Sequence, residues 1–241
     1  MAVIVNITAF SVTTDNEDLN ASNTGWTKNN NATGGTQIFQ VTNAASPNSA
    51  YPIAVDTTAY YRDETPGSGT QTVKAVMKRI STSGSGQALY LMARCTAAGD
   101  DWIGVAFYGD GTAELIKSIN GSRTSLGGSA GMTAFITAAG NTGTIELVVT
   151  KNGTNNTDVQ MFWTGTDSTR RQVGTTQNVT NSEVDGVGKV GLMARFAATT
   201  STTGLHFTTF YAEDDSSGAT GGGPLIGGLV RPILTRGRLV A

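Results

Sequence analysis

The sequence has little cysteine, histidine or charge, and each shortage excludes a class of protein. Among 241 residues there is one cysteine, Cys95, and one histidine, His206. One cysteine excludes an intrachain disulfide, and one histidine excludes a metal site built from several histidines. Charged residues make up 14% of the chain, against a typical ~25%, and the net charge is −2. This balance disfavours nucleic-acid binding, because the one basic segment lies at the C-terminal end.

Long apolar runs and helical periodicity are also missing. No stretch approaches the ~20 apolar residues of a membrane-spanning helix. The opening MAVIVNITAF is too short and too soon polar for a signal peptide, so we expect a protein made and folded in a cytoplasm. No segment keeps an apolar stripe at i, i+3 and i+4 over a dozen residues, so we expect almost no helix.

What the sequence has instead is glycine, at 31 residues, between short alternating runs. Two runs are near-copies, QALYLMARCTA at 87–97 and GKVGLMARFAA at 188–198. Because successive side chains of a strand point to opposite faces, each run predicts a half-buried strand with its arginine, Arg94 or Arg195, on the polar face. The apolar faces would hold Leu89, Leu91, Ala93 and Cys95 in the first copy and Val190, Leu192, Ala194 and Phe196 in the second. Cys95 is thus expected to be a small buried hydrophobe.

The other short runs end where Gly, Asn or Asp returns, which is typical of strands joined by tight turns. Strands are expected at 72–80, 87–96, 101–108, 113–119, 143–150, 158–164, 189–198 and 204–213, with shorter candidates at 37–42 and 51–61. Asp110-Gly111 and Asn120-Gly121 are hairpin signals. This regular spacing indicates an all-β fold, either an antiparallel sandwich or a barrel.

Several motifs follow one another in the order of a known family. They are YLMAR, DDWIGVAFYGDGTAELIKSINGSRTSLG, GTIELVVTKNGTNNTDVQMFW, VGKVGLMARFA and LHFTTFYAED. Over Ser22 to Asp214 the chain resembles the concanavalin A-like, laminin-G-like jelly rolls. The resemblance implies an antiparallel β-sandwich. Such domains serve as lectins, glycoside hydrolases, adhesion modules and virion proteins of tailed bacteriophages, so the resemblance does not choose between these functions.

The low charge, the Thr/Gly/Ala-rich composition and the C-terminal tail most resemble those of phage virion proteins. We therefore expect a non-enzymatic capsid decoration or cement protein, located in the virion after assembly in the host cytoplasm. Its partners would be the major capsid protein or other virion subunits. The protein itself would form a homo-oligomer, with a trimer favoured. The alternative is a carbohydrate-binding, lectin-like module, or a tail or fibre component, that uses the sandwich face. Trp102 and Tyr108 are candidates for stacking on sugar rings, with packing in the core or rim as the competing interpretation.

The chain divides by amino-acid composition into four parts. Residues 1–21 form an opening strand or an exchanged arm, 22–215 the jelly-roll sandwich, 216–223 a Gly/Ser linker and 224–241 an apolar and basic tail. The tail either packs on its own sandwich, docks in extended form on a partner, or is disordered. Its Pro and Gly residues disfavour a helix, and its arginines argue against membrane insertion. Its candidate partner-binding residues are Leu225, Ile226, Leu229, Val230, Arg231, Ile233, Leu234, Arg236, Arg238 and Leu239.

Few residues predict catalysis or cofactor binding, and we expect no catalytic residue. His206 stands between Leu205 and Phe207, which favours a polar-face strand residue over a general base. Glu114 and Glu146 stand singly on separate expected strands, whereas a glycosidase needs two carboxylates that face one bond. Ca²⁺ is the one cofactor left open, since loop carboxylates can hold it, although polar turn residues are the commoner interpretation. These loop carboxylates are Asp100, Asp101, Asp110, Asp214 and Asp215.

Overall fold

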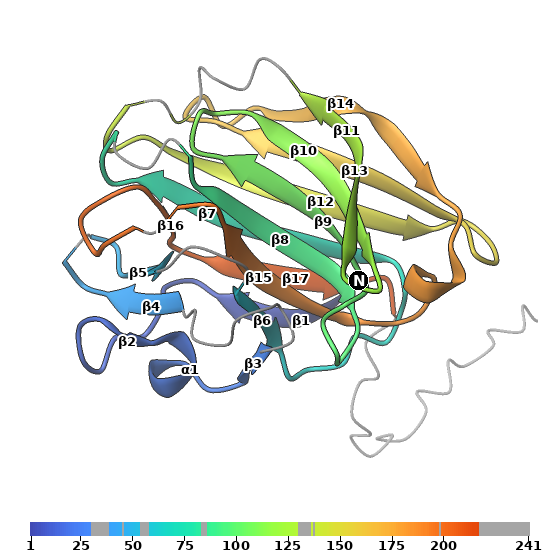
Figure 1. Ribbon diagram of the computed structural model, residues 1–241, viewed down its shortest axis with the longest axis horizontal. Helices are drawn as coiled ribbons and strands as arrows, with labels where there is room; N and C mark the ends of the chain where they lie inside the picture. The colour runs from blue at the N-terminus through green and yellow to red at the C-terminus, as the bar shows by residue number, and fades with distance from the viewer. Residues whose placement is uncertain are drawn as a thin grey trace, which may run out of the picture.

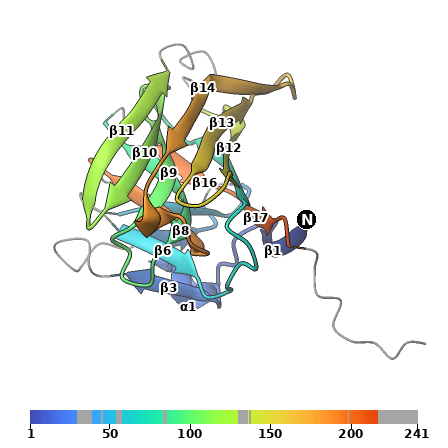
Figure 2. The same ribbon diagram turned by 90° about the vertical axis from the view of Figure 1, so that its right-hand side faces the viewer.

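The computed structural model describes two antiparallel β-sheets packed face to face (Figures 1 and 2). It describes residues 1–29, 39–44, 46–53, 58–82, 86–129, 136, 138–197 and 199–216. The predicted all-β antiparallel sandwich is confirmed. The linker from 217 onward and all ten tail residues assigned to partner binding lie outside this description.

Among the described residues the larger sheet has ten strands, and its core-facing residues alternate with polar ones. Its main path runs β14 (Arg170–Val179), β13 (Thr157–Thr164), β12 (Thr142–Lys151), β7 (Gln71–Arg79), β16 (Leu205–Phe207), β5 (Ser49–Pro52), β4 (Phe39–Thr42) and β2 (Glu17–Asp18). Strand β17 (Phe210–Asp214) also pairs with β7, and β1 (Ala2–Ile7) pairs with β17. The opening residues are therefore a strand of their own chain's sheet.

The smaller sheet has seven strands and contains both LMAR copies. Its order is β11 (Ser122–Ser129), β10 (Ala113–Ile119), β9 (Trp102–Tyr108), β8 (Ala88–Cys95), β15 (Lys189–Arg195), β6 (Thr58–Arg62) and β3 (Trp26–Asn29). Strands β8 and β15 pair directly, with Leu91 opposite Leu192. The near-copies are therefore neighbouring strands of one sheet.

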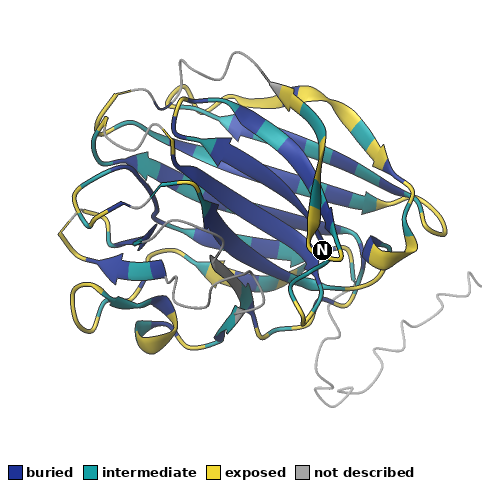
Figure 3. Ribbon diagram, in the orientation of Figure 1, coloured by how far each residue is buried: buried dark blue, intermediate teal, exposed yellow. Residues whose placement is uncertain are grey.

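The main core lies between the sheets and is built from alternate residues of each strand. In β8 and β15 these are Leu89, Leu91, Ala93, Val190, Leu192 and Ala194, as the alternation predicts. From the larger sheet, Trp163 stacks on Phe107 with ring centres 5.3 Å apart. Figure 3 shows the central strands buried and β14 mostly exposed, so the core is at the middle of the sandwich.

The predicted alternation is wrong at the end of β8. Two residues there, Ala93 and Arg94, lie opposite the single residue Val190, which is a β-bulge. The extra residue moves Cys95 to the opposite face, although Cys95 is buried as expected at 1% exposure. Arg94 has φ +52° and is 2% exposed, so it does not lie on a solvated polar face.

Arg94 instead ties the bulge to the end of the sandwich. Its Nε donates to the Gly69 carbonyl at 2.6 Å, and its Nη1 donates to the Thr157 hydroxyl of β13 at 2.5 Å and to the Val184 carbonyl at 2.8 Å. A buried guanidinium needs such acceptors, because an unpaired buried charge is costly. Arg94 is therefore a structural residue.

Helix is confined to two short pieces in the described residues. These are α1 (Leu19–Ser22) and the 3₁₀ helix η1 (Ser182–Val184). With four and three residues, neither is long enough to cross a membrane.

Candidate functional site

The outer face of the seven-stranded sheet carries a second apolar cluster. Its residues alternate with the core residues of the same strands, so they point away from the larger sheet. We call this cluster the floor; it consists of Ala88, Tyr90, Met92, Cys95, Trp102, Ala106, Ile116 and Met193. Each member is at most 5% exposed. A sheet face that is normally solvated is here covered by further side chains.

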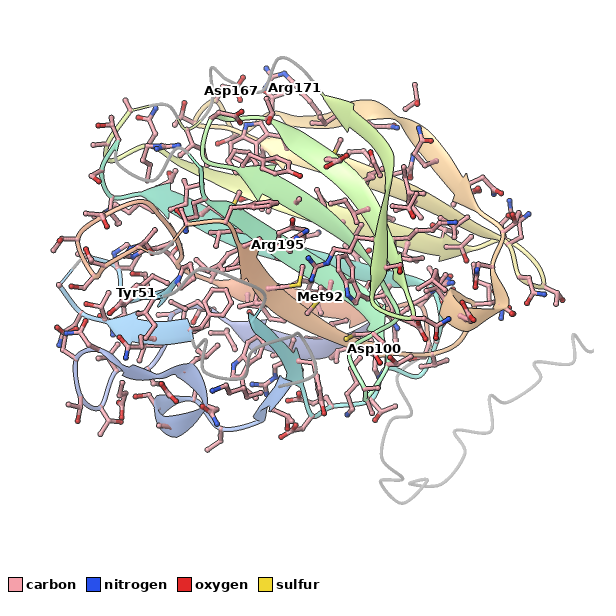
Figure 4. All side chains as sticks on the ribbon, in the orientation of Figure 1. Tyr51, Met92, Asp100, Asp167, Arg171 and Arg195 are labelled. Atoms are coloured by element: carbon pink, nitrogen blue, oxygen red, sulfur yellow. The ribbon has the colours of Figure 1, made fainter. Side chains whose placement is uncertain are left out.

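Aromatic and charged side chains lie over the floor. Arg123 from β11 lies 5.8 Å from the centre of the Trp102 ring, with its Nη2 3.6 Å from the Met193 sulfur. Arg195, the last residue of β15, lies with its guanidinium carbon 4.6 Å from the centre of the Phe196 ring. Figure 4 labels Arg195 and the floor residue Met92, which come from the paired strands β15 and β8. The predicted polar orientation of Arg195 is thus correct.

One hydrogen bond fixes the polar groups of this face: Tyr108 donates to Glu114 Oε2 at 2.7 Å. The Tyr90 hydroxyl lies near enough to Arg195 and to Tyr108 to interact with both. A cation and a carboxylate thus lie on either side of two tyrosine hydroxyls.

The two tyrosines are held in their neutral form. Burial raises the pKa of Tyr108, and its hydrogen bonds to Glu114 and Tyr90 raise it further. Burial also raises the pKa of Tyr90, although the charges of Arg195 and Arg123 act to lower it. A phenol with a raised pKa is a poor base at neutral pH, so this arrangement suits hydrogen bonding better than proton abstraction.

Phe196 is the exposed aromatic residue of this site. Its side chain is 49% exposed, its φ is +75°, and its ring stacks on Tyr108 with centres 6.5 Å apart. A positive φ is unfavourable for a bulky residue and is held only where the surroundings require it. The sequence alternation placed Phe196 on the core face, which is wrong, because the chain turns out of the sheet after Arg195. The two LMAR copies differ in the residue that follows the arginine, which is Cys95 in one and Phe196 in the other. This difference was the one feature of the sequence that could have indicated the exposed position of Phe196.

Comparisons with known proteins bear on the fold. No family model matches the chain, and no curated protein matches it. Among solved structures, a marine PL-14 alginate lyase from Aplysia kurodai is 10% identical, with 89% of this chain and 100% of the enzyme covered and a TM-score of 0.56. A variant of the GH43 protein BlXynB from Bacillus licheniformis is 12% identical, with 78% of this chain and 39% of that protein covered and a TM-score of 0.50. The carbohydrate-binding module CBM66 from Bacillus subtilis is 13% identical, with 79% and 96% covered and a TM-score of 0.48.

The chain has a concanavalin A-like sandwich fold. At these identities the likeness concerns the fold alone. The alginate lyase and the GH43 protein share this sandwich at 10% and 12% identity, and a shared fold does not by itself determine function.

The two predicted stacking residues occupy different layers of this concanavalin A-like sandwich. Trp102 is 1% exposed and lies in the floor, edge-on to Tyr90 at 6.1 Å between ring centres. Tyr108 lies above it, half-buried, between Glu114 and Phe196. In this conformation Trp102 presents no ring face to solvent, whereas the Tyr108 and Phe196 pair reaches the surface.

His206 lies far from this site and is buried. Its Nδ1 is 2.8 Å from the Ser49 hydroxyl, and its Nε2 is 3.0 Å from the carbonyl oxygens of Thr200 and Thr203. Burial lowers the pKa of His206 to about 4. An imidazole that accepts from Ser49 and donates to a carbonyl is neutral. His206 is therefore a buried residue of β16 whose two ring nitrogens both have hydrogen-bond partners.

The predicted carboxylates are also separated. Glu114 lies on the outer face of the smaller sheet, whereas Glu146 lies on the outer face of the larger sheet, paired with Arg170 at 2.7 Å. The described loop carboxylates serve as turn acceptors: Asp101 accepts from the Asn120 amide and Asp110 from the Thr112 amide. Within the described ranges, no three His, Cys, Asp or Glu residues come close enough together to hold a metal ion.

Proposed function

We propose that this protein binds carbohydrate on the outer face of its seven-stranded sheet, with Phe196 as the stacking ring. The observation that carries the proposal is Phe196 itself, half-exposed at a positive φ and stacked on Tyr108. Saccharide sites combine an apolar ring surface with a few fixed polar groups that orient the hydroxyls. Here Phe196 supplies the ring, and Arg195, Tyr108 and Glu114 supply the polar groups.

Binding fits this geometry better than hydrolysis. Glycoside hydrolysis needs two carboxylates on either side of one bond. Glu114 and Glu146 point away from opposite faces of the sandwich, and the Glu114 carboxylate already accepts from Tyr108. The alginate lyase that shares the fold acts on alginate, which is in keeping with a saccharide on this scaffold.

The test is a glycan panel with two matched variants. Phe196 is 49% exposed and Val3 is 59% exposed, but Val3 lies in β1 of the larger sheet and not in the sheet that carries the floor. We expect Phe196→Ala to weaken glycan binding by about tenfold or more, because an aromatic platform contributes on the order of 1–2 kcal/mol. Val3→Ala should leave binding unchanged. Loss of affinity in both variants, or in neither, would contradict the proposal.

Virion attachment is a separate proposal that rests on the sequence. We propose, as the second role, that residues 224–241 anchor the sandwich to a capsid subunit, and that several copies act together. The apolar and basic texture of the tail supports this role. The two proposals use different parts of the chain, so each can fail without the other.

A further inference from the structure

Arg195 is half-buried and, unlike the exposed Arg170 and Arg171, has no acidic partner among the described residues. Arg170 pairs with Glu146, and Arg171 pairs with Asp167. No carboxylate among the described residues forms an ion pair with Arg195, and its Nε has no hydrogen-bond partner there. Its contacts are the Tyr90 hydroxyl and the Phe196 ring. A half-buried guanidinium held in this way retains most of its capacity to bind an anion.

The Glu114 carboxylate on this face does not pair with Arg195. It accepts the Tyr108 hydroxyl at 2.7 Å, and among the described residues no ion pair joins it to Arg195. The Arg195 guanidinium is half-buried, so its charge is screened less than that of a group on an open surface.

The cation and the stacking ring are adjacent. The Arg195 guanidinium carbon lies 4.6 Å from the centre of the Phe196 ring. A sugar ring that contacts Phe196 therefore brings a carboxylate attached to it within reach of the guanidinium. The planar fork of arginine matches the two oxygens of a carboxylate, which sets this anion apart from a neutral hydroxyl.

We infer that the saccharide bound here is acidic: a uronic acid unit stacks on Phe196 and its carboxylate pairs with Arg195. This inference rests on the carbohydrate-binding function proposed above and names the class of sugar.

The experiment compares acidic and neutral forms of one saccharide on the full chain. The probes are polygalacturonate and alginate oligosaccharides, their carboxyl-reduced counterparts and a sulfated glycan, measured by isothermal titration calorimetry. We expect binding of the carboxylated forms to be at least tenfold tighter than that of the reduced forms, and to weaken as salt rises. A charge-assisted bidentate contact predicts that Arg195→Gln weakens the acidic probes by about tenfold to a hundredfold. The same variant should change binding of the reduced probes by less than about twofold.

Two further variants make the result specific. Arg195→Lys keeps the charge but loses the fork, so we expect an intermediate affinity. Arg171→Gln removes an exposed arginine at the end of the larger sheet, far from Arg195 in Figure 4, and should leave affinity unchanged. If Arg195→Gln does not fold, the comparison of acidic and reduced probes on the unaltered chain still tests whether the bound saccharide is acidic.

The outcomes separate the two proposals. If the unaltered chain binds neither form, the carbohydrate-binding function itself is wrong. If it binds both forms equally, or prefers the sulfated glycan, the function stands and the uronic acid inference is overturned. If Arg195→Gln weakens both forms equally, Arg195 acts only through the shape of the site, which also overturns the inference.

Discussion

At the scale of single residues, environment decides what each polar side chain does. The sequence has one histidine, and burial between Ser49 and the carbonyls of Thr200 and Thr203 makes it a neutral structural group. The two LMAR arginines have the same local sequence, yet Arg94 is buried among carbonyls while Arg195 lies over an outer face. Residue type alone therefore identifies neither role.

The buried His206 predicts a pH-dependent stability. Its pKa is about 4 in the folded state, because of burial, against an ordinary value of 6.5. Between these values the unfolded chain binds more protons, so the free energy of unfolding is complete above pH 6.5 and falls as the pH drops. At ~1.4 kcal/mol per pH unit, the loss by pH 4 is roughly 3 kcal/mol.

Urea unfolding at a series of pH values measures this loss. Acidic residues also titrate in this range, so the matched chain is His206→Asn, which cannot titrate at that position. We expect the variant to be less stable at pH 7 and to lose less stability on acidification. Equal losses in the two chains would rule out His206 as the source.

At the scale of strands, apolar alternation predicts buried elements well and exposed ones poorly. Strands β8, β9, β12 and β13 lie close to their predicted ranges, since each carries apolar residues at every second position. Strand β14 was missed, because its sequence RRQVGTTQNV is almost wholly exposed and has two apolar residues. It is held by pairing with β13, which a local pattern does not reveal.

The bulge of β8 predicts that position 188, directly before the neighbouring strand β15, requires glycine. A Cβ on Gly188 would lie 2.2 Å from the Arg94 carbonyl carbon, whereas a Cβ on Gly186 would meet nothing within 4 Å. We expect Gly188→Ala to lower the free energy of unfolding by about 1–3 kcal/mol through overpacking against backbone. Gly186→Ala, two residues away, should have little effect. Denaturant midpoints of the two variants measure this difference in stability. Equal midpoints would show that the backbone at the bulge shifts to accommodate the added methyl group.

At the scale of the whole molecule, the sandwich brings distant segments to one face. Tyr90, Tyr108, Glu114, Arg123 and Arg195 come from five strands, and they meet because β11, β10, β9, β8 and β15 are consecutive in one sheet. The larger sheet contributes nothing to this face but supports it from behind. Strand β1, which begins the chain, pairs with β17 in the other sheet.

The proposed capsid attachment is tested by truncation. The shortened chain should end at Ser216, because the Ser216 amide and the Gly67 amide both donate to the Asp214 carboxylate that ends β17. We expect the full chain to sediment with virus shells that lack it, and the shortened chain to remain in the supernatant while still folded. Equal sedimentation would remove the anchoring role from the tail. Glycan binding by the shortened chain should be unchanged.

By itself the sequence determined the fold class, the two LMAR strands and the buried state of Cys95, because strand periodicity is a local property that alternating residues express directly. Only the tertiary structure decided which outer face is covered, where Arg94 points and that Phe196 reaches the surface. These depend on a bulge opposite Val190 and on strands brought together from distant parts of the chain. A two-residue period carries no information about an extra residue in a neighbouring strand, so the candidate site became visible only when the sheet was assembled.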